Sequence, residues 1–361
     1  MDRILATYRI TASESESRVR AEALATEQSV EMPLAAISDP RVLEEIVAKV
    51  ESIRPHADYF DVVLGIAPST TGNETSQLMN MLFGNCSMQP EVELIDVEFP
   101  AGYEKAFPGP RFGIEGIRAA TGVKSGALTC TALKPQGSPV EHLASLASTF
   151  ALAGIDVIKD DHGIADQAAH PFAERVPAVQ KAITGANRET GGNTIYAPTF
   201  SGGHRALAEQ ARIAKDHGVR MALVAPLLVG LPAFVELQEL GIPLMAHPAF
   251  AGGGRIAPPV LLGTIFRMLG ADATIFPNHG GRFSYSRELC LAIARNARAP
   301  WNGMRPALPV PAGGMTLDRV DDMIAGYGSD TMLLIGGGLL SARDLLLERS
   351  REFIRAVHAR A

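Results

Sequence analysis

The sequence predicts an α/β protein with two parts: an N-terminal α+β domain of the ferredoxin-like kind over residues 1–110, and a C-terminal TIM (β/α)8 barrel over residues 111–361. From residue 127 onward, eight short apolar runs alternate with longer segments of helical character, whereas residues 1–110 do not continue this rhythm. The boundary is predicted at residues 107–110 (FPGP), because proline and glycine interrupt both helical and strand periodicity.

The N-terminal part reads as a small mixed unit. Strands are predicted at 5–10, 59–66 and 92–99, and helices at 16–25 and 75–83. Strands and helices alternate in the manner of the split βαβ motif.

Each apolar run of the second part is short and apolar on consecutive positions, as expected for a parallel strand buried on both faces. The intervening segments read as helices, for example 140–153, 204–217, 286–298 and, at the end, 340–361. Eight strand–helix units in roughly 230 residues favour a barrel, whose typical size is about 250, over the main alternative of a doubly wound open sheet. The runs are 127–133, 155–159, 194–200, 221–226, 243–247, 273–276, 307–311 and 331–335.

Composition excludes several classes of protein. The 361 residues are 47% hydrophobic and 20% charged with a net charge of −6, as in a globular protein that is large enough for two domains. No stretch is basic enough to predict nucleic-acid binding, and no apolar run reaches the ~18 residues of a membrane helix. The N-terminus lacks the apolar segment of a signal peptide, and Cys86, Cys130 and Cys290 are widely spaced. We therefore expect free thiols and a cytoplasmic location.

Polar and glycine residues follow the predicted strands, at the end of a barrel where active sites lie. The most informative segment is 159–162 (KDDH), after the second run. Lys159 and Asp161 share one face of the extended chain, and a turn can bring His162 alongside. Asp161 and His162 are candidate ligands of a divalent cation, and Lys159 is a third if CO2 converts its amine to a carbamate, an oxygen ligand that suits Mg²⁺. The alternative is a solvated charged turn.

Lys134 ends an uncharged run and is a candidate general base. The alternative is a lysine that extends from the barrel rim into water. His247 and His279 also lie at strand ends and are candidates for proton transfer or substrate contact, although a histidine at such a position is as often a structural hydrogen bonder.

Two glycine segments end the last two strands, where many barrels bind phosphate through backbone N–H groups. The candidates are Gly313, Gly314, Gly337 and Gly338. Each segment alone is also explained by turn glycines that let the chain reverse.

With these residues in place, the chain resembles the RuBisCO superfamily over nearly its full length. The similar segments are 83–85 (FGN), 107–114 (FPGPRFGI), Lys134-Pro135, 154–161 (GIDVIKDD), 309–314 (PVPAGG) and 335–338 (IGGG). The resemblance implies that Lys134 handles the substrate proton, that Lys159 carries CO2 as a carbamate, and that Asp161 binds the metal. It also implies that Asn85 and Glu27 reach the barrel of a second subunit, so that a homodimer shares its active sites.

Departures from the family pattern restrict the reaction. The second acidic metal ligand is replaced by His162, a softer ligand that leaves open Mg²⁺ or another divalent cation. Segment 278–285 (NHGGRFSY) lacks the mobile lysine of carboxylating members, and arginine is not equivalent to lysine. Where the family has an arginine that helps bind the second phosphate of a bisphosphate, this chain has Pro248. Where the family has a serine before the glycines of segment 309–314, this chain has Ala312. The resemblance thus implies a sugar monophosphate that is enolised without CO2 fixation.

Among RuBisCO-like proteins, the implied activity is the isomerisation of 5-methylthioribulose 1-phosphate to 1-methylthioxylulose 5-phosphate in methionine salvage. Two alternatives of the same chemistry are a 2,3-diketo-5-methylthiopentyl-1-phosphate enolase and a decarboxylase or hydrolase of a branched β-keto sugar-acid phosphate. A non-catalytic protein that binds a phosphate ligand is the alternative of another class.

Overall fold

The computed structural model describes residues 2–301 and 303–359, which form two compact units. Unit 1 contains the chain up to Pro108, together with Ala251–Leu261 and residues 303–304. Unit 2 contains Gly109–Phe250, Leu262–Trp301 and the chain from Arg305 onward. The division falls inside the proline- and glycine-rich segment 107–110.

Unit 1 is a four-stranded antiparallel sheet in the order β2-β3-β1-β4, with the chain order βαββαβ of a ferredoxin-like fold. Alternate residues of β1 are buried, from Ile4 to Ile10, because one sheet face packs on the core. The elements are β1 (Ile4–Ile10), α1 (Ser17–Glu27), β2 (Lys49–Pro55), β3 (Phe60–Ile66), α2 (Thr75–Phe83) and β4 (Val92–Glu98).

The sequence prediction missed β2. This strand lies at the sheet edge, no residue of it is buried, and its pairing with β3 shifts between Val50 and Ser52. An exposed edge strand has no apolar face to produce the alternation that marks a strand.

The segment Ala251–Leu261 was assigned to the barrel domain 111–361 by the sequence, but it packs in unit 1. The Leu94 amide donates to the Arg255 carbonyl at 2.9 Å, and the Ala257 amide donates to the Leu94 carbonyl at 2.8 Å. The Arg255 guanidinium donates to the Val92 carbonyl at 2.9 Å. Pairing beside β4 requires contacts between residues about 160 positions apart, which no local pattern can predict.

Unit 2 alternates parallel strands with helices, and each of the eight predicted runs overlaps a strand, with two strands, β7 and β8, in the run 194–200. The strands form two parallel sheets, β13-β5-β6-β7 and β8-β9-β10-β11-β12, and only Pro198 separates β7 from β8. If β7 and β8 are taken as one interrupted strand, eight strands follow one another in the order of the chain. Closure of these strands into one barrel stays a prediction. The strands are β5 (Leu128–Leu133), β6 (Val157–Asp160), β7 (Ile195–Ala197), β8 (Thr199–Phe200), β9 (Ala222–Val224), β10 (Leu244–Ala246), β11 (Ala273–Pro277), β12 (Leu308–Ala312) and β13 (Met332–Leu334).

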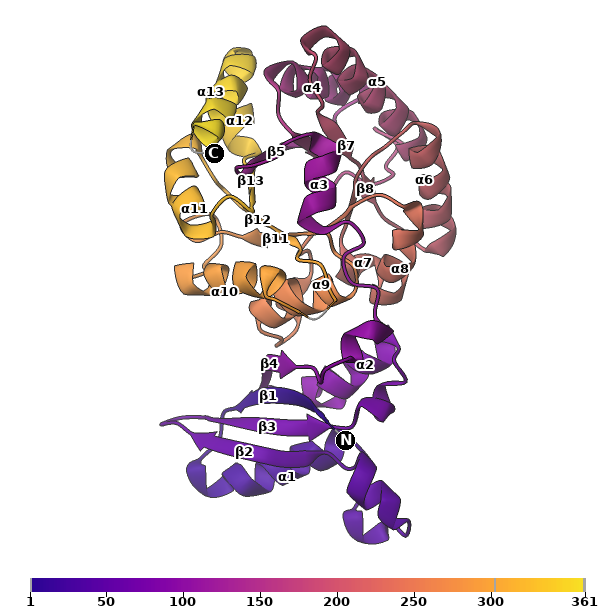
Figure 1. The fold of residues 1–361 in the computed structure, drawn as a ribbon, viewed down its shortest axis with the longest axis vertical. Helices are drawn as coiled ribbons and strands as arrows, with labels where there is room; N and C mark the ends of the chain where they lie inside the picture. The colour runs from indigo at the N-terminus through magenta and orange to yellow at the C-terminus, as the bar shows by residue number, and fades with distance from the viewer. Residues whose placement is uncertain (1, 302, 360–361) are drawn as a thin grey trace. The chain divides into compact units, whose positions relative to one another are not determined.

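The helices of unit 2 surround these strands (Figure 1). α4 has the predicted bounds, since Gly154 ends it with a left-handed φ of 97°. The predicted helix 340–361 is instead divided into α12, a short 3-10 turn at Arg343–Leu345 and α13, since Arg343 has a φ of 49°, which lies outside the α-helical region. Residues 360–361 lie outside the described residues. The helices are α3 (Gly113–Thr121), α4 (Val140–Ala153), α5 (Phe172–Thr190), α6 (His204–Asp216), α7 (Pro226–Val229), α8 (Leu231–Glu236), α9 (Phe266–Met268), α10 (Arg287–Arg298), α11 (Val320–Tyr327), α12 (Gly337–Leu340) and α13 (Leu346–His358).

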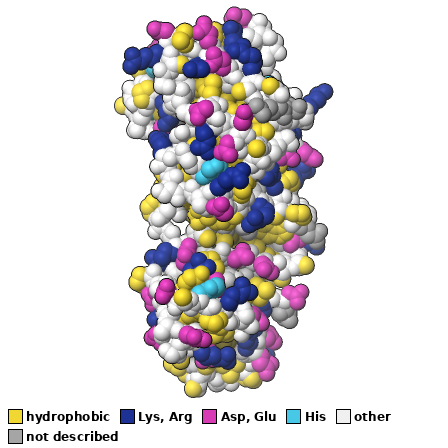
Figure 2. Space-filling model, turned by 90° about the vertical axis from the view of Figure 1, so that its left-hand side faces the viewer, with side chains coloured by type: hydrophobic (Ala, Val, Ile, Leu, Met, Phe, Trp, Pro, Cys, Tyr) yellow, Lys and Arg dark blue, Asp and Glu magenta, His cyan; other side chains and the backbone are white. Residues whose placement is uncertain are grey.

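The surface and the thiols agree with the composition. On the face in Figure 2, acidic and basic side chains are interspersed, without a broad area of one sign. None of the helices in the described ranges has the length and apolarity that crossing a bilayer requires. Cys86, Cys130 and Cys290 are free and buried, as predicted.

Candidate active site

Lys134 and Asp161 lie side by side because β5 and β6 end together. The two strands are parallel with Leu133 opposite Asp160, and the Asp161 amide donates to the Leu133 carbonyl at 3.1 Å. The Lys134 Nζ lies 2.7 Å from Asp161 Oδ1. The side chains are 30% and 18% exposed, so a solute can reach a charge pair whose backbone is fixed by the sheet.

His162 and His247 come from the ends of different strands and stack, with ring centroids 4.3 Å apart and planes 10° apart. His162 Nδ1 lies 3.4 Å from Asp161 Oδ1. The His247 amide donates to the Val224 carbonyl at 2.7 Å, which extends the β9–β10 pairing by one residue. His247 Nδ1 accepts from the Ala249 amide at 3.1 Å, and this acceptor role puts the proton of the neutral ring on Nε2.

The electrostatics of this group favour particular protonation states. Burial lowers the pKa of Lys159, which increases the neutral fraction of its amine. Burial alone would raise the pKa of Asp161, but hydrogen bonds from His162 and Lys134 outweigh it and the net pKa is lowered. Burial and the charge of Lys159 lower the pKa of His247 to about 2, so this imidazole is neutral at pH 7. The site therefore holds an ionised carboxylate beside a neutral histidine.

Asp160, between the two candidate metal ligands in the chain, is the centre of a buried network. Its carboxylate accepts from the Tyr196 hydroxyl at 2.7 Å, from Arg175 Nε at 3.2 Å and from the Thr199 amide at 3.0 Å. The backbone carbonyl of Asp160 accepts from Lys159 Nζ at 2.9 Å. The side chains of Asp160 and Arg175 are 0% exposed, so this network holds the end of β6 from the interior of the protein.

The same arginine holds the following loop. Arg175 Nη1 donates to the carbonyls of Ala165 and His170, each at 2.6 Å. The buried His170 ring in turn accepts at Nε2 from the Gly137 amide at 3.3 Å, in the loop after β5. One chain of contacts thus connects the loops that carry Lys134 and Asp161.

Sequence reasoning missed this network, although a signal existed. Arg175 lies among Phe172, Val176 and Val179, apolar positions that repeat at helical spacing and are buried in α5. A charged residue on the apolar face of a helix needs a buried partner, and Asp160 follows a strand in the same unit.

The glycines after β13 lie beside Lys134. A Cβ at Gly336 would lie 3.7 Å from Lys134 Cε, and a Cβ at Gly338 would lie 2.8 Å from the Met315 carbonyl oxygen. The segment after β13 therefore packs on the segment after β12. A Cβ at Gly337 would meet no atom within 4 Å, so this position faces open space.

Gly313 and Gly314 both have positive φ, 90° and 95°. A Cβ at Gly313 would lie 3.1 Å from the Phe283 ring, and a Cβ at Gly314 would lie 2.7 Å from Arg282 Cγ. Backbone conformation and close packing against the loop after β11 are thus sufficient to require glycine here. Phosphate binding at these glycines stays a prediction.

His279, the third predicted proton-transfer residue, is held by α11. Its Nε2 lies 3.0 Å from Asp322 Oδ2, and the same carboxylate accepts from Arg319 at 2.8 Å. His279 Nδ1 is buried without a hydrogen-bond partner in the described residues. His279 therefore contacts Asp322, whereas His247 stacks on His162, the neighbour of Asp161.

The two predicted N-terminal residues contact each other within unit 1. Asn85 Nδ2 donates to Glu27 Oε1 at 2.9 Å, which joins the end of α1 to the turn after α2. Both side chains are partly exposed, so the pair can contact a ligand or another subunit.

The predicted metal ligands are Lys159, Asp161 and His162. No cluster of three or more His, Cys, Asp or Glu that could hold a metal occurs within residues 2–301 and 303–359. Two such residues, Asp161 and His162, lie together, and a third ligand requires the Lys159 carbamate. The buried Lys159 amine has a lowered pKa, and the neutral amine is the form that reacts with CO2. If Lys159 carries the carbamate, the three ligands Lys159, Asp161 and His162 therefore fit a divalent cation.

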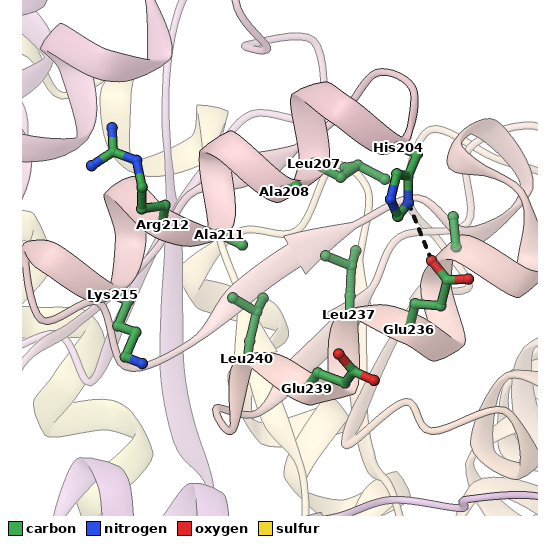
Figure 3. Close-up of a pocket in the computed structure, with 11 residues that line it drawn as sticks. His204, Leu207, Ala208, Ala211, Arg212, Lys215, Glu236, Leu237, Glu239 and Leu240 are labelled. Atoms are coloured by element: carbon green, nitrogen blue, oxygen red, sulfur yellow. Dashed lines mark ion pairs between the residues drawn. The ribbon is translucent and has the colours of Figure 1, made fainter.

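A groove of about 450 Å³ lies elsewhere in unit 2, between α6 and the segment 231–240 (Figure 3). Leu207, Leu237 and Leu240 line it, and His204 pairs with Glu236 at 3.4 Å across one end (Figure 3). None of the predicted site residues lines this groove.

Comparison with known proteins identifies the class. Residues 113–253 match the family model of the ribulose bisphosphate carboxylase large chain, catalytic domain. The chain is 51% identical over 360 residues to a 5-methylthioribulose-1-phosphate isomerase of Rhodospirillum rubrum, with 99% of this chain and 96% of the relative covered. It belongs to the RuBisCO large-chain superfamily, and within it to the RuBisCO-like (form IV) proteins.

Two further comparisons bear on fold and function. The crystal structure of a Rubisco-like protein from Rhodopseudomonas palustris superposes with a TM-score of 0.93 at 47% identity, covering 99% of this chain and 98% of the other. A 2,3-diketo-5-methylthiopentyl-1-phosphate enolase of Geobacillus kaustophilus is 35% identical over 292 residues, covering 78% of this chain and 71% of the relative.

Proposed function

We propose that this protein is a metal-dependent isomerase that enolises a sugar monophosphate without fixing CO2, converting 5-methylthioribulose 1-phosphate to 1-methylthioxylulose 5-phosphate. The observation that carries the proposal is the solvent-accessible pair of Lys134 and Asp161 at adjacent strand ends. The 51% identity over 99% of the chain to a relative named for this reaction supports the choice of substrate.

Lys134 is the general base in this proposal. Its amine lies 2.7 Å from the Asp161 carboxylate and next to the open glycine segment after β13, so it can face a substrate held there. Once the Lys134 ammonium has given its proton to solvent, the amine takes a proton from the substrate carbon beside the carbonyl and returns one to the former carbonyl carbon. Two successive transfers of this kind move the carbonyl two carbons along the chain, as the proposed product requires. The neutral His247, with its proton on Nε2, assists at a neighbouring oxygen, and His279 is the other candidate for this role.

Asp161, His162 and the carbamate of Lys159 would hold Mg²⁺ or another divalent cation. A cation there supplies Lewis-acid stabilisation of negative charge that develops on substrate oxygens. The Asp160 network fixes the residue between these two ligands, because Lys159 Nζ donates to the Asp160 carbonyl and the Thr199 amide donates to the Asp160 carboxylate. The stacked ring of His247 in turn restrains His162.

The phosphate would lie at Gly313, Gly314, Gly337 and Gly338, at the ends of β12 and β13. The two segments pack on each other, and the position of Gly337 is open. In a closed barrel, which we also propose, β13 lies between β12 and β5, and the proposed phosphate site at the ends of β12 and β13 is then close to Lys134 at the end of β5.

We further propose a homodimer in which Glu27 and Asn85 of one subunit complete the site of the other. The partly exposed Glu27–Asn85 hydrogen bond supports this role, because it holds both side chains in one orientation. The three free, buried cysteines support a reducing, cytoplasmic location.

The second candidate reaction is the enolisation of 2,3-diketo-5-methylthiopentyl 1-phosphate. The 35% identity to an enolase of that name favours it, and the same base and cation site would serve it. The two reactions differ in product, so one experiment separates them.

The experiment is proton NMR of the full-length protein with 5-methylthioribulose 1-phosphate in D2O, with Mg²⁺ and bicarbonate. Deuterium in the carbon chain together with a methylthioxylulose 5-phosphate signal is the expected result. Exchange without that product would contradict the isomerase reaction. The experiment would then be repeated with 2,3-diketo-5-methylthiopentyl 1-phosphate. No exchange with either substrate, with the metal also varied, would contradict the enolising site.

A further inference from the structure

We propose that Arg282 binds the phosphate group of the substrate and sets the affinity for it. The inference rests on the proposed function, since it adds a cation to the proposed phosphate site at the ends of β12 and β13. It assigns a ligand role to a side chain that comes from the loop after β11.

The backbone fixes Arg282 beside Gly313 and Gly314, the glycines that follow β12. The Arg282 amide donates to the Gly313 carbonyl at 2.8 Å, and the Asn278 amide donates to the Ala312 carbonyl at 2.8 Å. A Cβ at Gly281 would lie only 2.2 Å from the Gly313 carbonyl oxygen, so the loop lies directly on the end of β12. The loop therefore has little freedom to move away from the glycines without losing these contacts.

The stem of the Arg282 side chain passes over Gly314, since a Cβ there would lie 2.7 Å from Arg282 Cγ. The guanidinium extends beyond this contact into solvent, and its Cζ lies 5.7 Å from the centre of the Phe283 ring. Contact with the stem leaves the N–H groups of the guanidinium directed to solvent, where an anion can accept from them.

The charges of neighbouring cations are already neutralised, whereas that of Arg282 is not. Lys134 pairs with Asp161, and Arg319 pairs with Asp322. No ion pair joins Arg282 to a carboxylate of the described residues. An exposed guanidinium held over glycines, without an acidic partner, favours an anionic ligand.

Phosphate suits this arrangement. A guanidinium donates two parallel hydrogen bonds to phosphate oxygens, and backbone N–H groups of glycines supply the remaining donors. The glycines of the proposed phosphate site carry no charge, so Arg282 would supply the positive charge there. A single guanidinium suits a substrate with a single phosphate group.

The test compares Arg282→Ala and Arg282→Lys with Arg295→Ala, which removes an exposed arginine of α10 and serves as the matched charge control. Inorganic phosphate is the probe, through its dissociation constant by calorimetry and its inhibition constant against turnover. We expect Arg282→Ala to weaken phosphate binding about 10- to 100-fold and to raise KM by a similar factor, with a smaller change in kcat. Arg282→Lys should be intermediate, because lysine keeps the charge without the two-donor geometry.

Unchanged phosphate binding in Arg282→Ala, or equal weakening in Arg295→Ala, would overturn the inference, the second because net charge alone would then explain the effect. Wild-type protein that binds no phosphate would overturn it as well. If phosphate binding depends on Arg282 but no deuterium exchange occurs with either substrate, the proposed reaction fails and the phosphate site stands. The two failures are therefore distinguishable.

Discussion

The Tyr196 hydroxyl donates a 2.7 Å hydrogen bond to Asp160, the residue that lies between Lys159 and Asp161 in the chain. Arg175 binds the other oxygen of the same carboxylate at 3.2 Å. An acid, a guanidinium and a phenol, all buried, thus form one unit behind the candidate active site. The buried charges stabilise the fold only while every partner is present.

Replacing Arg175 by Met should therefore destabilise the protein by about 3–5 kcal/mol, because it leaves the Asp160 charge buried and unpaired. Urea unfolding followed by circular dichroism measures this. Arg212→Met is the control, since that arginine is exposed on α6 and its loss should cost no more than about 0.5 kcal/mol. Equal losses in the two variants would contradict a special role for the network.

Lys134→Ala should lower the rate of carbon-bound proton exchange by at least about 100-fold, because it removes the proposed base. Deuterium incorporation by NMR gives the rate, and an unchanged unfolding midpoint shows that the variant folds. Lys181→Ala, on the exposed face of α5, is the control that should keep full activity. Near-normal exchange in Lys134→Ala would assign the proton transfer to another group.

Carbamate formation on Lys159 should be visible with ¹³C-bicarbonate. The wild-type protein with Mg²⁺ should give a carbamate carbon signal and bicarbonate-dependent activity, whereas Lys159→Ala should give neither. Lys181→Ala should keep both, as its exposed amine belongs to no ligand set. A carbamate signal that survives Lys159→Ala would place the modification on a different lysine.

The pH dependence of stability should carry a signature of His247. Its pKa in the folded protein is lowered from 6.5 to about 2, first by burial and then by the charge of Lys159. Below pH 6.5 the unfolded chain binds a proton that the folded chain does not, so the free energy of unfolding falls as the pH falls, and it is independent of this group above pH 6.5.

Accordingly, His247→Asn should lose less stability than the wild-type protein between pH 7 and pH 5. Urea unfolding at both pH values measures the difference, and His217→Asn, at an exposed position, is the matched control. If both variants follow the wild-type dependence, His247 is protonated in the folded protein and the assignment of a neutral ring is wrong.

Mixing two inactive variants tests the shared active site. Asn85→Ala damages the N-terminal contribution and Lys134→Ala damages the base, so a mixed dimer has one intact site if subunits share sites. Random exchange would restore about a quarter of wild-type activity, because half of the dimers are mixed and each has one working site of two. No recovery, with subunit exchange shown by mass spectrometry, would mean that each subunit forms its own site.

Much of the fold was predictable because short apolar runs alternate with segments of helical character along the chain. The bounds of α4 were predicted to the residue, and the runs that became β5 and β12 are buried along their whole length. The strand β2 was not predictable from such a pattern, since none of its residues is buried. The proximity of Lys134, Asp161 and His162 followed from the ends of neighbouring strands. The stack of His162 on His247 did not, because it depends on the rotamers of two distant residues.

The pairing of Ala251–Leu261 beside β4 also has a consequence for how the protein is made. Leu94 forms two backbone hydrogen bonds to this segment, and Arg255 binds the Val92 carbonyl. Chains emerge from the ribosome N-terminus first, and early domains usually fold at once. Here the first unit also contains residues 303–304, so it cannot be completed until residue 304 has been synthesised, when most of the second unit has already emerged. The two units are thus obliged to mature together, and a truncated chain that ends at residue 108 would leave the Leu94 amide without its native partner.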